Sequence, residues 1–452
     1  MDVLEADANK TKNPIPDTNC MDEYPTPAQA WTVVAILCFL STMSFVDRNL
    51  LPLLSVTIAK DLQLTDTQIG ALSGIAFGTF YAAASLPYGW ALDRYSRRCV
   101  IWSGVFVWSL ATMACGLARN FAAIFTARAV VGSGEVALNP GSQSIFADIF
   151  PPERLALPMS VYGLGARMGG GASFIIGGFL AALIPVNEVY QILGVGAVKG
   201  WQVIFLIAGL PGLFISFVMF AIPEPPRRHL PSRGSTHTTY MDYFRFMAGQ
   251  IRFFLAHHAG VITIVAATNA IIAWTPAFFM RSYGWRTDQV GFWLGIAFAV
   301  GPLIGIPLHG ALVDRLFRRG RLDAHHFYLK SMLLVATLPA ALVYLVPSPW
   351  VAIGLLCLSQ GLTAGYIGVL PAALQLMIPG NLRGKGASVA SLISGFVGMS
   401  MGPTLTSFVT QHVFHDPNKV GMSIAISTAI LMPAAALLFT IAQKPMAQRL
   451  AR

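Results

Sequence analysis

The chain has 452 residues, of which 55% are hydrophobic and only 11% charged, and its formal net charge is +10. A soluble domain carries about 25% charged residues, so this chain has too little charge to cover a surface in contact with water. The composition predicts a membrane protein, and it excludes a soluble enzyme, a disordered chain and a free nucleic-acid-binding protein.

Twelve apolar runs are long enough to cross a bilayer as helices, which takes about 20 residues each. An even number of spans places both termini on the same side of the membrane. The predicted fold class is therefore an all-α integral membrane protein with twelve transmembrane helices. The runs lie at 31–57, 66–91, 99–117, 121–147, 155–184, 201–222, 257–280, 287–312, 327–346, 350–378, 385–411 and 420–442.

The basic residues orient this set of helices. Of the 30 Lys and Arg residues, 20 lie in the two tails and in the loops on the same side, 6 lie in the opposite loops, and 4 lie within spans. Because loops on the cytosolic side are enriched in Lys and Arg, we expect a multi-pass protein of the cell membrane with both termini in the cytosol. The positive charge then orients the protein in the membrane and contacts anionic membrane lipid, so we expect no nucleic-acid partner.

An internal repeat divides the chain in two. Residues 70–98 and 291–319 share ten of 29 positions at an offset of 221 residues, where chance gives about two. Helices 2 and 8 therefore correspond, which predicts a duplicated six-helix unit with a binding site between the halves. The predicted domains are a cytosolic tail at 1–30, a six-helix bundle at 31–222, a cytosolic linker with an amphipathic helix at 223–256, a second bundle at 257–442, and a cytosolic tail at 443–452.

The repeat ends in a short motif in each half. The two copies read GWALDRYSRR at 89–98 and GALVDRLFRR at 310–319. A carboxylate at a helix end can pair with an arginine or with the N-terminus of a neighbouring helix, so Asp93 and Asp314 are predicted to clasp the cytosolic ends of helices in one transport state. The candidate latch residues are Gly89, Asp93, Arg94, Arg97, Arg98, Gly310, Asp314, Arg315, Arg318 and Arg319.

These two motifs resemble the loop signature of the major facilitator superfamily. The resemblance covers nearly the whole chain and implies two pseudo-symmetric six-helix bundles, the major facilitator fold. It implies the same latch role for the two motifs. Ser96 and Phe317 depart from the pattern, because they replace the usual loop glycine, and Ser173-Phe174 replaces the Gly-Pro found in many antiporters, so antiport is not assigned.

The first half is more particularly similar to the spinster branch, which transports sphingolipids and lysolipids. The similar segments are VDRN at 46–49, DRYSRR at 93–98, TARAVVGSGE at 126–135 and ADIF at 147–150. The resemblance implies a secondary transporter that moves a lipid-like substrate of the lysophospholipid or sphingosine-phosphate type by alternating access. Relatives that carry sugar acids share the Asp-Arg of the first span, so a proton-coupled symporter of small organic anions remains an alternative.

Charged residues within the spans mark the candidate transport site. An intramembrane carboxylate is costly unless it is paired or neutralised, and only Asp47 and Glu135 lie well inside spans. A rise of 1.5 Å per residue places Asp47 and Arg128 at a similar depth. We therefore predict a switchable, proton-linked ion-pair network of Asp47, Arg128 and Glu135, with the neighbouring Arg48 counted in the same network; a static salt bridge between the first and fourth spans is the alternative. Arg128 or Arg167, or else Arg48, is the candidate holder of a substrate anion.

The second half has no Asp or Glu in its span interiors. Its candidate substrate-binding residues are polar or aromatic: Thr268, Asn269, Trp274, Tyr366 and Gln375. A cavity that is charged on one wall and apolar on the other suits an amphiphile with an anionic or zwitterionic head.

Other classes of site are absent from the sequence pattern. No phosphate-binding loop, dinucleotide fold or catalytic triad can be placed, and we expect neither cofactor nor metal. His257-His258 and His325-His326 are interpreted as surface histidines near the cytosol. We expect a monomer that is not an enzyme; a membrane lipid-modifying enzyme or scramblase is the alternative from another class, and it lacks a cluster of catalytic residues.

Overall fold

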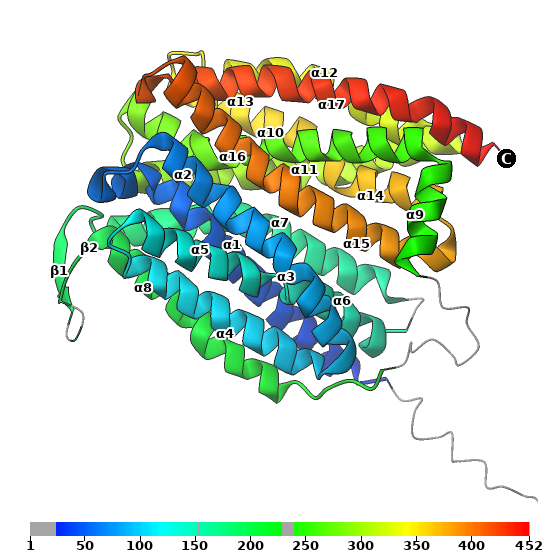
Figure 1. Ribbon diagram of the computed structural model, residues 1–452, viewed down its shortest axis with the longest axis horizontal. Helices are drawn as coiled ribbons and strands as arrows, with labels where there is room; N and C mark the ends of the chain where they lie inside the picture. Colours follow the sequence, from blue (N-terminus) through cyan, green and yellow to red (C-terminus); the bar gives the residue numbers. More distant parts are fainter. Residues whose placement is uncertain (1–23, 152–153, 193, 195, 228–238, 452) are drawn as a thin grey trace, which may run out of the picture.

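The computed structural model describes residues 24–151, 154–192, 194, 196–227 and 239–451. Long helices run side by side in two groups, one from each half of the chain (Figure 1). The first half comprises α1 (Pro27–Leu62), α2 (Asp66–Ser73), α3 (Ile75–Arg94), α4 (Arg97–Gly116), α5 (Phe121–Glu135), α6 (Leu138–Ile149), α7 (Ala156–Leu183), α8 (Gly200–Ser216) and η3 (Phe217–Ala221).

The second half follows a short crossing helix, α9 (Tyr240–Gly249). In this half the eleventh span contains two π-helical segments, η5 (Ser394–Gly398) and η6 (Val409–Val413). The other helices are α10 (Ile251–Tyr283), α11 (Thr287–Arg318), α12 (Ala324–Leu342), α13 (Pro349–Thr363), α14 (Tyr366–Met377), η4 (Gly380–Leu382), α15 (Arg383–Ile393), α16 (Met399–Phe408), η7 (Pro417–Lys419) and α17 (Val420–Leu450).

The helices form twelve spans, six in each half. Eleven of them are long and apolar enough to cross a membrane by length and composition within the described residues. The remaining span, α12, has 19 residues and carries His325 and His326 in its first turn, which lower its mean hydropathy. The predicted all-α architecture with two six-helix bundles is confirmed.

Local sequence signals set where the spans begin and end. Thr26 and Thr65 form capping boxes with Gln29 and Gln68 at the starts of α1 and α2, which satisfies backbone N–H groups that have no partner within the helix. Gly284 ends α10 in the left-handed conformation, with φ of 66°, which glycine adopts without a steric penalty.

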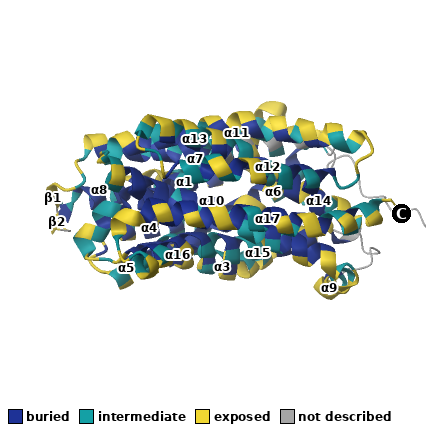
Figure 2. Ribbon diagram, turned by 90° about the horizontal axis from the view of Figure 1, so that it is seen from above, coloured by how far each residue is buried: buried dark blue, intermediate teal, exposed yellow. Residues whose placement is uncertain are grey.

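The outward face of the bundle is apolar. Leu86, Phe214 and Leu437 are 68%, 69% and 64% exposed. Exposed residues alternate with buried ones along the outer helices in Figure 2. A soluble protein of this size would cover such a surface with charge, so these side chains are placed to contact lipid tails.

Two spans are broken at corresponding places. The fourth span is interrupted at Val136-Ala137, between α5 and α6, and the tenth at Ala364-Gly365, between α13 and α14. A proline follows each break, Pro140 in α6 and Pro371 in α14, and proline lacks the N–H that would continue the helical hydrogen bonds. Each of these spans therefore consists of two shorter rigid segments.

The two ends of the molecule differ. At one end, which we call the hairpin end, the strands β1 (Val189–Ile192) and β2 (Gly196–Lys199) pair antiparallel, with Val189 opposite Lys199. The opposite end, which we call the linker end, carries α9 and the last residues of α17 (Figure 1). These names are used below for position along the helices.

Toward the hairpin end the two halves are in close contact through small residues. A methyl group on Gly291 of α11 would lie 2.5 Å from the Cα of Gly178 of α7, and one on Gly74 would lie 2.6 Å from the carbonyl oxygen of Ser400. Such backbone contacts need residues without side chains. This seam joins α7 to α11 and the second span to α16.

An ion pair closes the same end. Arg281 of α10 donates two hydrogen bonds to the Asp66 carboxylate of α2, at 2.8 and 2.7 Å. The Thr67 hydroxyl donates to the Gln411 side chain at 2.7 Å. Among the described residues, the hydrogen bonds between the halves all lie toward the hairpin end. The structure is therefore closed at this end.

Candidate functional site

A cavity of about 560 Å³ lies between the two halves. It extends from Phe174 and Phe298, near mid-height, to Ala387 in α15, which begins at the linker end. Among the described lining residues the first half contributes the two charged side chains, Arg48 and Glu135, together with the polar residues Ser41, Ser44, Asn49, Tyr81, Asn139 and Tyr162. The cavity therefore opens toward the linker end while the seam closes the hairpin end.

An ion pair between Arg48 of α1 and Glu135 of α5 forms part of the first-half wall. The guanidinium nitrogen lies 2.5 Å from the carboxylate oxygen, and the side chains are 22% and 1% exposed. The Arg48 guanidinium also lies over the ring of Phe77, 4.5 Å from its centroid. A guanidinium between a carboxylate and an aromatic face is held by charge and by cation–π attraction.

Arg128 lies directly behind this pair. Its guanidinium donates to the backbone carbonyl of Asp47 at 3.1 Å and reaches that of Arg48 at 3.5 Å. Asp47 is buried, at 3% exposure. No ion pair joins its carboxylate to Arg128 in the described part of the chain, in contrast to the expected pairing. Consecutive residues on a helix point about 100° apart, and it is Arg48 that faces Glu135.

The four predicted network residues are thus brought together with a different pairing. Arg48 is the partner of Glu135, and Arg128 braces the backbone of α1 from the far side. Three of their polar atoms are buried with no hydrogen-bond partner: Arg48 Nε, Arg128 Nε and Glu135 Oε1. Such a network has capacity for a further ligand or proton. Arg167 lies in α7, but its side chain is outside what the structure describes.

The opposite wall comes from the second half and includes four of the five predicted residues there. Thr268, Asn269, Tyr366 and Gln375 all line the cavity. The Thr268 hydroxyl is 3.5 Å from the Tyr366 hydroxyl, and the Asn269 amide donates to the Val265 carbonyl at 2.9 Å. The helices α10 and α14 therefore both present polar side chains at the cavity surface.

Trp274 is placed differently from the expectation. It is 1% exposed, it is not among the described residues that line the cavity, and its indole N–H donates to the Pro403 carbonyl at 2.9 Å. The side chain fills space between α10 and α16. This burial is favourable because the large ring packs against apolar neighbours while its single donor, the indole N–H, is satisfied by the Pro403 carbonyl. Trp274 is therefore a packing residue of the second bundle.

The histidines are also corrected. His257, His258, His325 and His326 are all buried rather than on the surface, and His257 Nδ1 lies 3.0 Å from His326 Nε2. Aromatic residues pack around this cluster, including Phe253 and Phe439. These rings shield the imidazoles from water and carry no charge themselves. His257 reaches the central cavity.

Sequence reasoning missed several cavity residues. Asn49, Tyr81, Asn139 and Gln360 line the cavity but carry no charge, and of these only Asn49 lies in a quoted segment, VDRN at 46–49. Asn49 follows directly after Asp47-Arg48, so a polar side chain next to a charged pair within a span was an available signal. The others depend on how each helix is rotated, which composition does not define.

The first loop motif makes contacts that involve the linker. Arg97 is 1% exposed and forms ion pairs with Asp148 and, at 3.0 Å, with Glu224. Glu224 also accepts hydrogen bonds from the Ser96 hydroxyl at 2.6 Å and from the backbone N–H groups of Arg97 and Arg98 at 3.0 and 3.1 Å. The anion at the N-terminus of α4 is therefore Glu224 from the start of the linker.

These contacts stabilise the charged form of Glu224. Burial raises its pKa, but the hydrogen bonds from Ser96, Arg97 and Arg98 outweigh burial and hold the pKa of this carboxyl below its usual value. Asp93 is exposed, and its backbone carbonyl accepts a hydrogen bond from Arg227 of the linker. The linker therefore fastens to the loop that was predicted to act as a latch.

The second motif is open in this conformation. Asp314, Arg315, Arg318 and Arg319 are exposed, and no ion pair involves them among the described residues. The space next to Gly89 and Gly310, at the start of each motif, is empty within 4 Å. The second motif therefore forms no clasp in a structure in which the cavity opens toward the linker end, and the latch role of the two motifs stays a prediction.

Comparisons with known proteins agree with this architecture. The profile of the Major Facilitator Superfamily matches residues 35–403. An MFS-type efflux pump from Mycolicibacterium smegmatis is 25% identical over 429 residues, covering 94% of this chain and 95% of its own length. Protein spinster of Drosophila melanogaster is 23% identical, covering 87% and 64%.

A transporter of another substrate class is similar as well. The probable galactarate/D-glucarate transporter of Escherichia coli is 28% identical over 326 residues, covering 66% of this chain and 68% of its own length. Relatives that are named for an activity are transporters or a pump, so the expectation that the chain is not an enzyme is confirmed.

Solved structures show the same fold. A crystal structure of a bacterial homologue of the human lysosomal transporter spinster, in an inward-facing and unoccupied conformation, has a TM-score of 0.77 at 22% identity. The match covers 94% of this chain and 98% of the other chain. The expected resemblance to spinster proteins is confirmed, and at this identity the likeness in structure concerns the fold.

Proposed function

The chain belongs to the Major Facilitator Superfamily, and from that premise we propose that it is a proton-linked secondary transporter of an amphiphile with an anionic or zwitterionic head. The observation that carries the proposal is the asymmetry of the central cavity. Its first-half wall holds the Arg48–Glu135 pair. Its described second-half lining contains no Asp, Glu, Lys or Arg.

The head of the substrate binds at Arg48. A guanidinium is suited to the oxygens of phosphate or carboxylate because it presents several N–H donors in one plane. Arg48 keeps 22% of its side chain exposed to the cavity, whereas Arg128 is 1% exposed and committed to backbone carbonyls. Arg48 is therefore the accessible anion-binding group, and Arg128 positions the helix that carries it.

The tail of the substrate lies along the second half. Ile272, Phe298, Ile367, Leu370 and Leu374 line that wall, and burial of apolar area contributes about 25 cal/mol per Å². An acyl or sphingoid chain gains from this surface, whereas a small polyol gains nothing from it.

Glu135 supplies the link to protons. When Glu135 is ionised it holds Arg48, and when it is protonated Arg48 is released for a substrate anion. Binding of substrate and of a proton then favour each other through a single guanidinium. Conversion to the opposite state requires the Asp66–Arg281 pair to open and the linker end to close, which is alternating access.

The distribution of basic residues predicts the orientation of the protein in the membrane. The linker end carries the basic loops and tails, so it faces the cytosol of a cell membrane by the positive-inside rule. The conformation described above is then open to the cytosol.

The test is transport by the purified protein in liposomes, with and without a pH gradient. The panel contains a labelled lysophospholipid, galactarate and a lipophilic cation. We expect saturable lysophospholipid transport that depends on the pH gradient. Arg48→Gln is expected to lose substrate affinity at least tenfold, and Glu135→Gln to lose the pH dependence, whereas Glu188→Gln, which neutralises an exposed carboxylate at the hairpin end outside the cavity, is the matched control.

A second candidate is a proton-coupled symporter of sugar acids. The similarity to the galactarate/D-glucarate transporter favours it, as do the polar groups Asn49, Asn139 and Gln360 at the cavity surface. Transport of galactarate without any transport of lysophospholipid refutes the amphiphile proposal in favour of this one. An unchanged pH dependence in Glu135→Gln refutes the proton role.

A further inference from the structure

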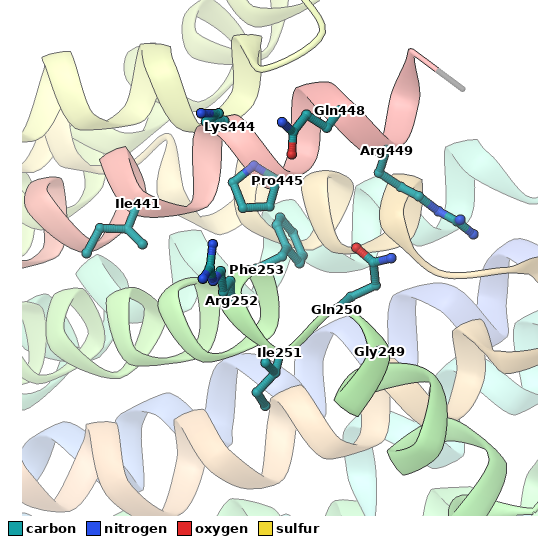
Figure 3. Close-up of a pocket in the computed structure, with 10 residues that line it drawn as sticks. All are labelled: Gly249, Gln250, Ile251, Arg252, Phe253, Ile441, Lys444, Pro445, Gln448 and Arg449. Atoms are coloured by element: carbon teal, nitrogen blue, oxygen red, sulfur yellow. The ribbon is translucent and has the colours of Figure 1, made fainter.

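A second cavity, of about 570 Å³, lies at the linker end between the start of α10 and the end of α17. Figure 3 shows Arg252 projecting from α10 toward the segment of α17 that carries Lys444 and Pro445. This cavity and the central cavity have no lining residue in common. It is therefore separate from the proposed transport site.

The cavity is positively charged. Arg252, Lys444 and Arg449 line it, and none of its ten lining residues is acidic. All three side chains are exposed, and in the part of the chain that the structure describes none of them takes part in an ion pair. Gln250 and Gln448 add amide donors from the two facing helices. Three cations and two amides around one cavity fit a phosphate group.

The position of the cavity selects a lipid as the source of that phosphate. Ile251 and Ile441 line it and are 49% and 52% exposed, on a bundle whose outer surface is apolar. On α17 the first basic residue, Lys444, comes one turn after Ile441. On α17, an apolar side chain followed within a turn by a cation marks the depth at which acyl chains give way to headgroups.

The amphipathic helix α9 lies at the same depth. It crosses the ends of the long helices at the linker end (Figure 1). Arg449 is placed against it, with the guanidinium 5.8 Å from the centroid of the Phe246 ring. The cavity is thus bordered by α9, α10 and α17.

We propose that this cavity binds the headgroup of an anionic glycerophospholipid. The phosphate is held by Arg252 and Lys444, and the acyl chains run along Ile441 and Leu437 on the outer face of α17. Basic pockets between transmembrane helices bind such headgroups, and each nearby Lys or Arg strengthens attraction to anionic lipid about fivefold. A bound lipid fastens the start of α10 to the end of α17 and to the linker helix.

The test is lipid binding to the full-length protein in a neutral detergent, followed by native mass spectrometry. The probes are dioctanoyl phosphatidylglycerol and dioctanoyl phosphatidylcholine, with inorganic phosphate as a competitor. We expect phosphatidylglycerol to bind at least tenfold more tightly than phosphatidylcholine. The triple variant Arg252→Gln, Lys444→Gln, Arg449→Gln is expected to lose this affinity by about a hundredfold.

The matched control is Arg154→Gln with Arg245→Gln, which removes exposed basic residues at the same end but outside the cavity. The control is expected to bind phosphatidylglycerol as the unaltered protein does. Equal binding by the triple variant, an equal loss in the control, or displacement of the lipid by millimolar inorganic phosphate each overturns the proposal. Thermal unfolding of the triple variant without added lipid shows whether it is folded.

Discussion

The ion pair between Asp66 and Arg281 is expected to set the balance between the two transport states. The pair joins the halves at the hairpin end with two hydrogen bonds of 2.7 and 2.8 Å, and its side chains are 7% and 13% exposed. Opening this end separates the partners and returns both charges to water. The pair therefore favours the conformation described here.

Its contribution follows from its burial and geometry. Truncating one partner of a buried, hydrogen-bonded charge pair costs about 2–5 kcal/mol. We take the lower end, because Asp66 lies in the first turn of α2, where the helix dipole continues to stabilise its charge. Arg281→Gln is then expected to shift the equilibrium by about 2 kcal/mol, or roughly 30-fold, toward the state that is open at the hairpin end.

The assay is the distance between spin labels at Arg119 and Lys419, which are exposed on hairpin-end loops of opposite halves, in a background without reactive cysteines. The matched control is Arg286→Gln. Its pair with Asp288 lies at the same end, but the Arg286 side chain is 75% exposed, so its loss changes little. A distance distribution for Arg281→Gln that is the same as for Arg286→Gln refutes the reasoning.

Three further predictions test other contacts. Gly291→Val places side-chain atoms against the backbone of α7, since a methyl group there already lies 2.5 Å from the Gly178 Cα; it should lengthen the same spin-label distance, whereas Gly354→Val, which has open space around it, should not. Glu224→Gln removes the anion at the start of α4 and should lower unfolding stability by about 1 kcal/mol at neutral pH; an unchanged melting temperature contradicts this. Because the folded-state pKa of Glu224 is lowered, its contribution is present above the unfolded value of about 4.3 and lost as pH falls through the folded value, so the difference between the two proteins should shrink on acidification.

The sequence was sufficient for the fold but only partly so for the site. Hydropathy and the duplicated motif predicted the spans and the correspondence of the halves, because membrane helices must satisfy their backbone internally and reveal themselves by length. Depth along a helix follows from residue count, which is why Asp47, Arg128 and Glu135 were predicted to lie together. Rotation about the helix axis does not follow from residue count, and that rotation is what pairs Glu135 with Arg48.

Other features depended on tertiary contacts. Nothing in the local sequence indicates that Glu224 folds back to α4, since a carboxylate in a Pro-rich linker has many available partners. The burial of His257 and His326 arises because aromatic residues from α10 and α17 enclose them. Which end of the cavity is open is a property of one conformation. The sequence encodes both the conformation open at the linker end and the one open at the hairpin end, so it does not predict which of them is seen.

The breaks at Val136-Ala137 and Ala364-Gly365 have a mechanical consequence. Each divides its span near the central cavity, with Glu135 at the end of α5 and Tyr366 at the start of α14. The segments α6 and α14 can therefore rotate about these breaks relative to α5 and α13. Each break lies next to a residue that lines the cavity. A substrate bound in the cavity therefore changes the angle at both breaks, and α6 and α14 transmit this change along their length to the linker end.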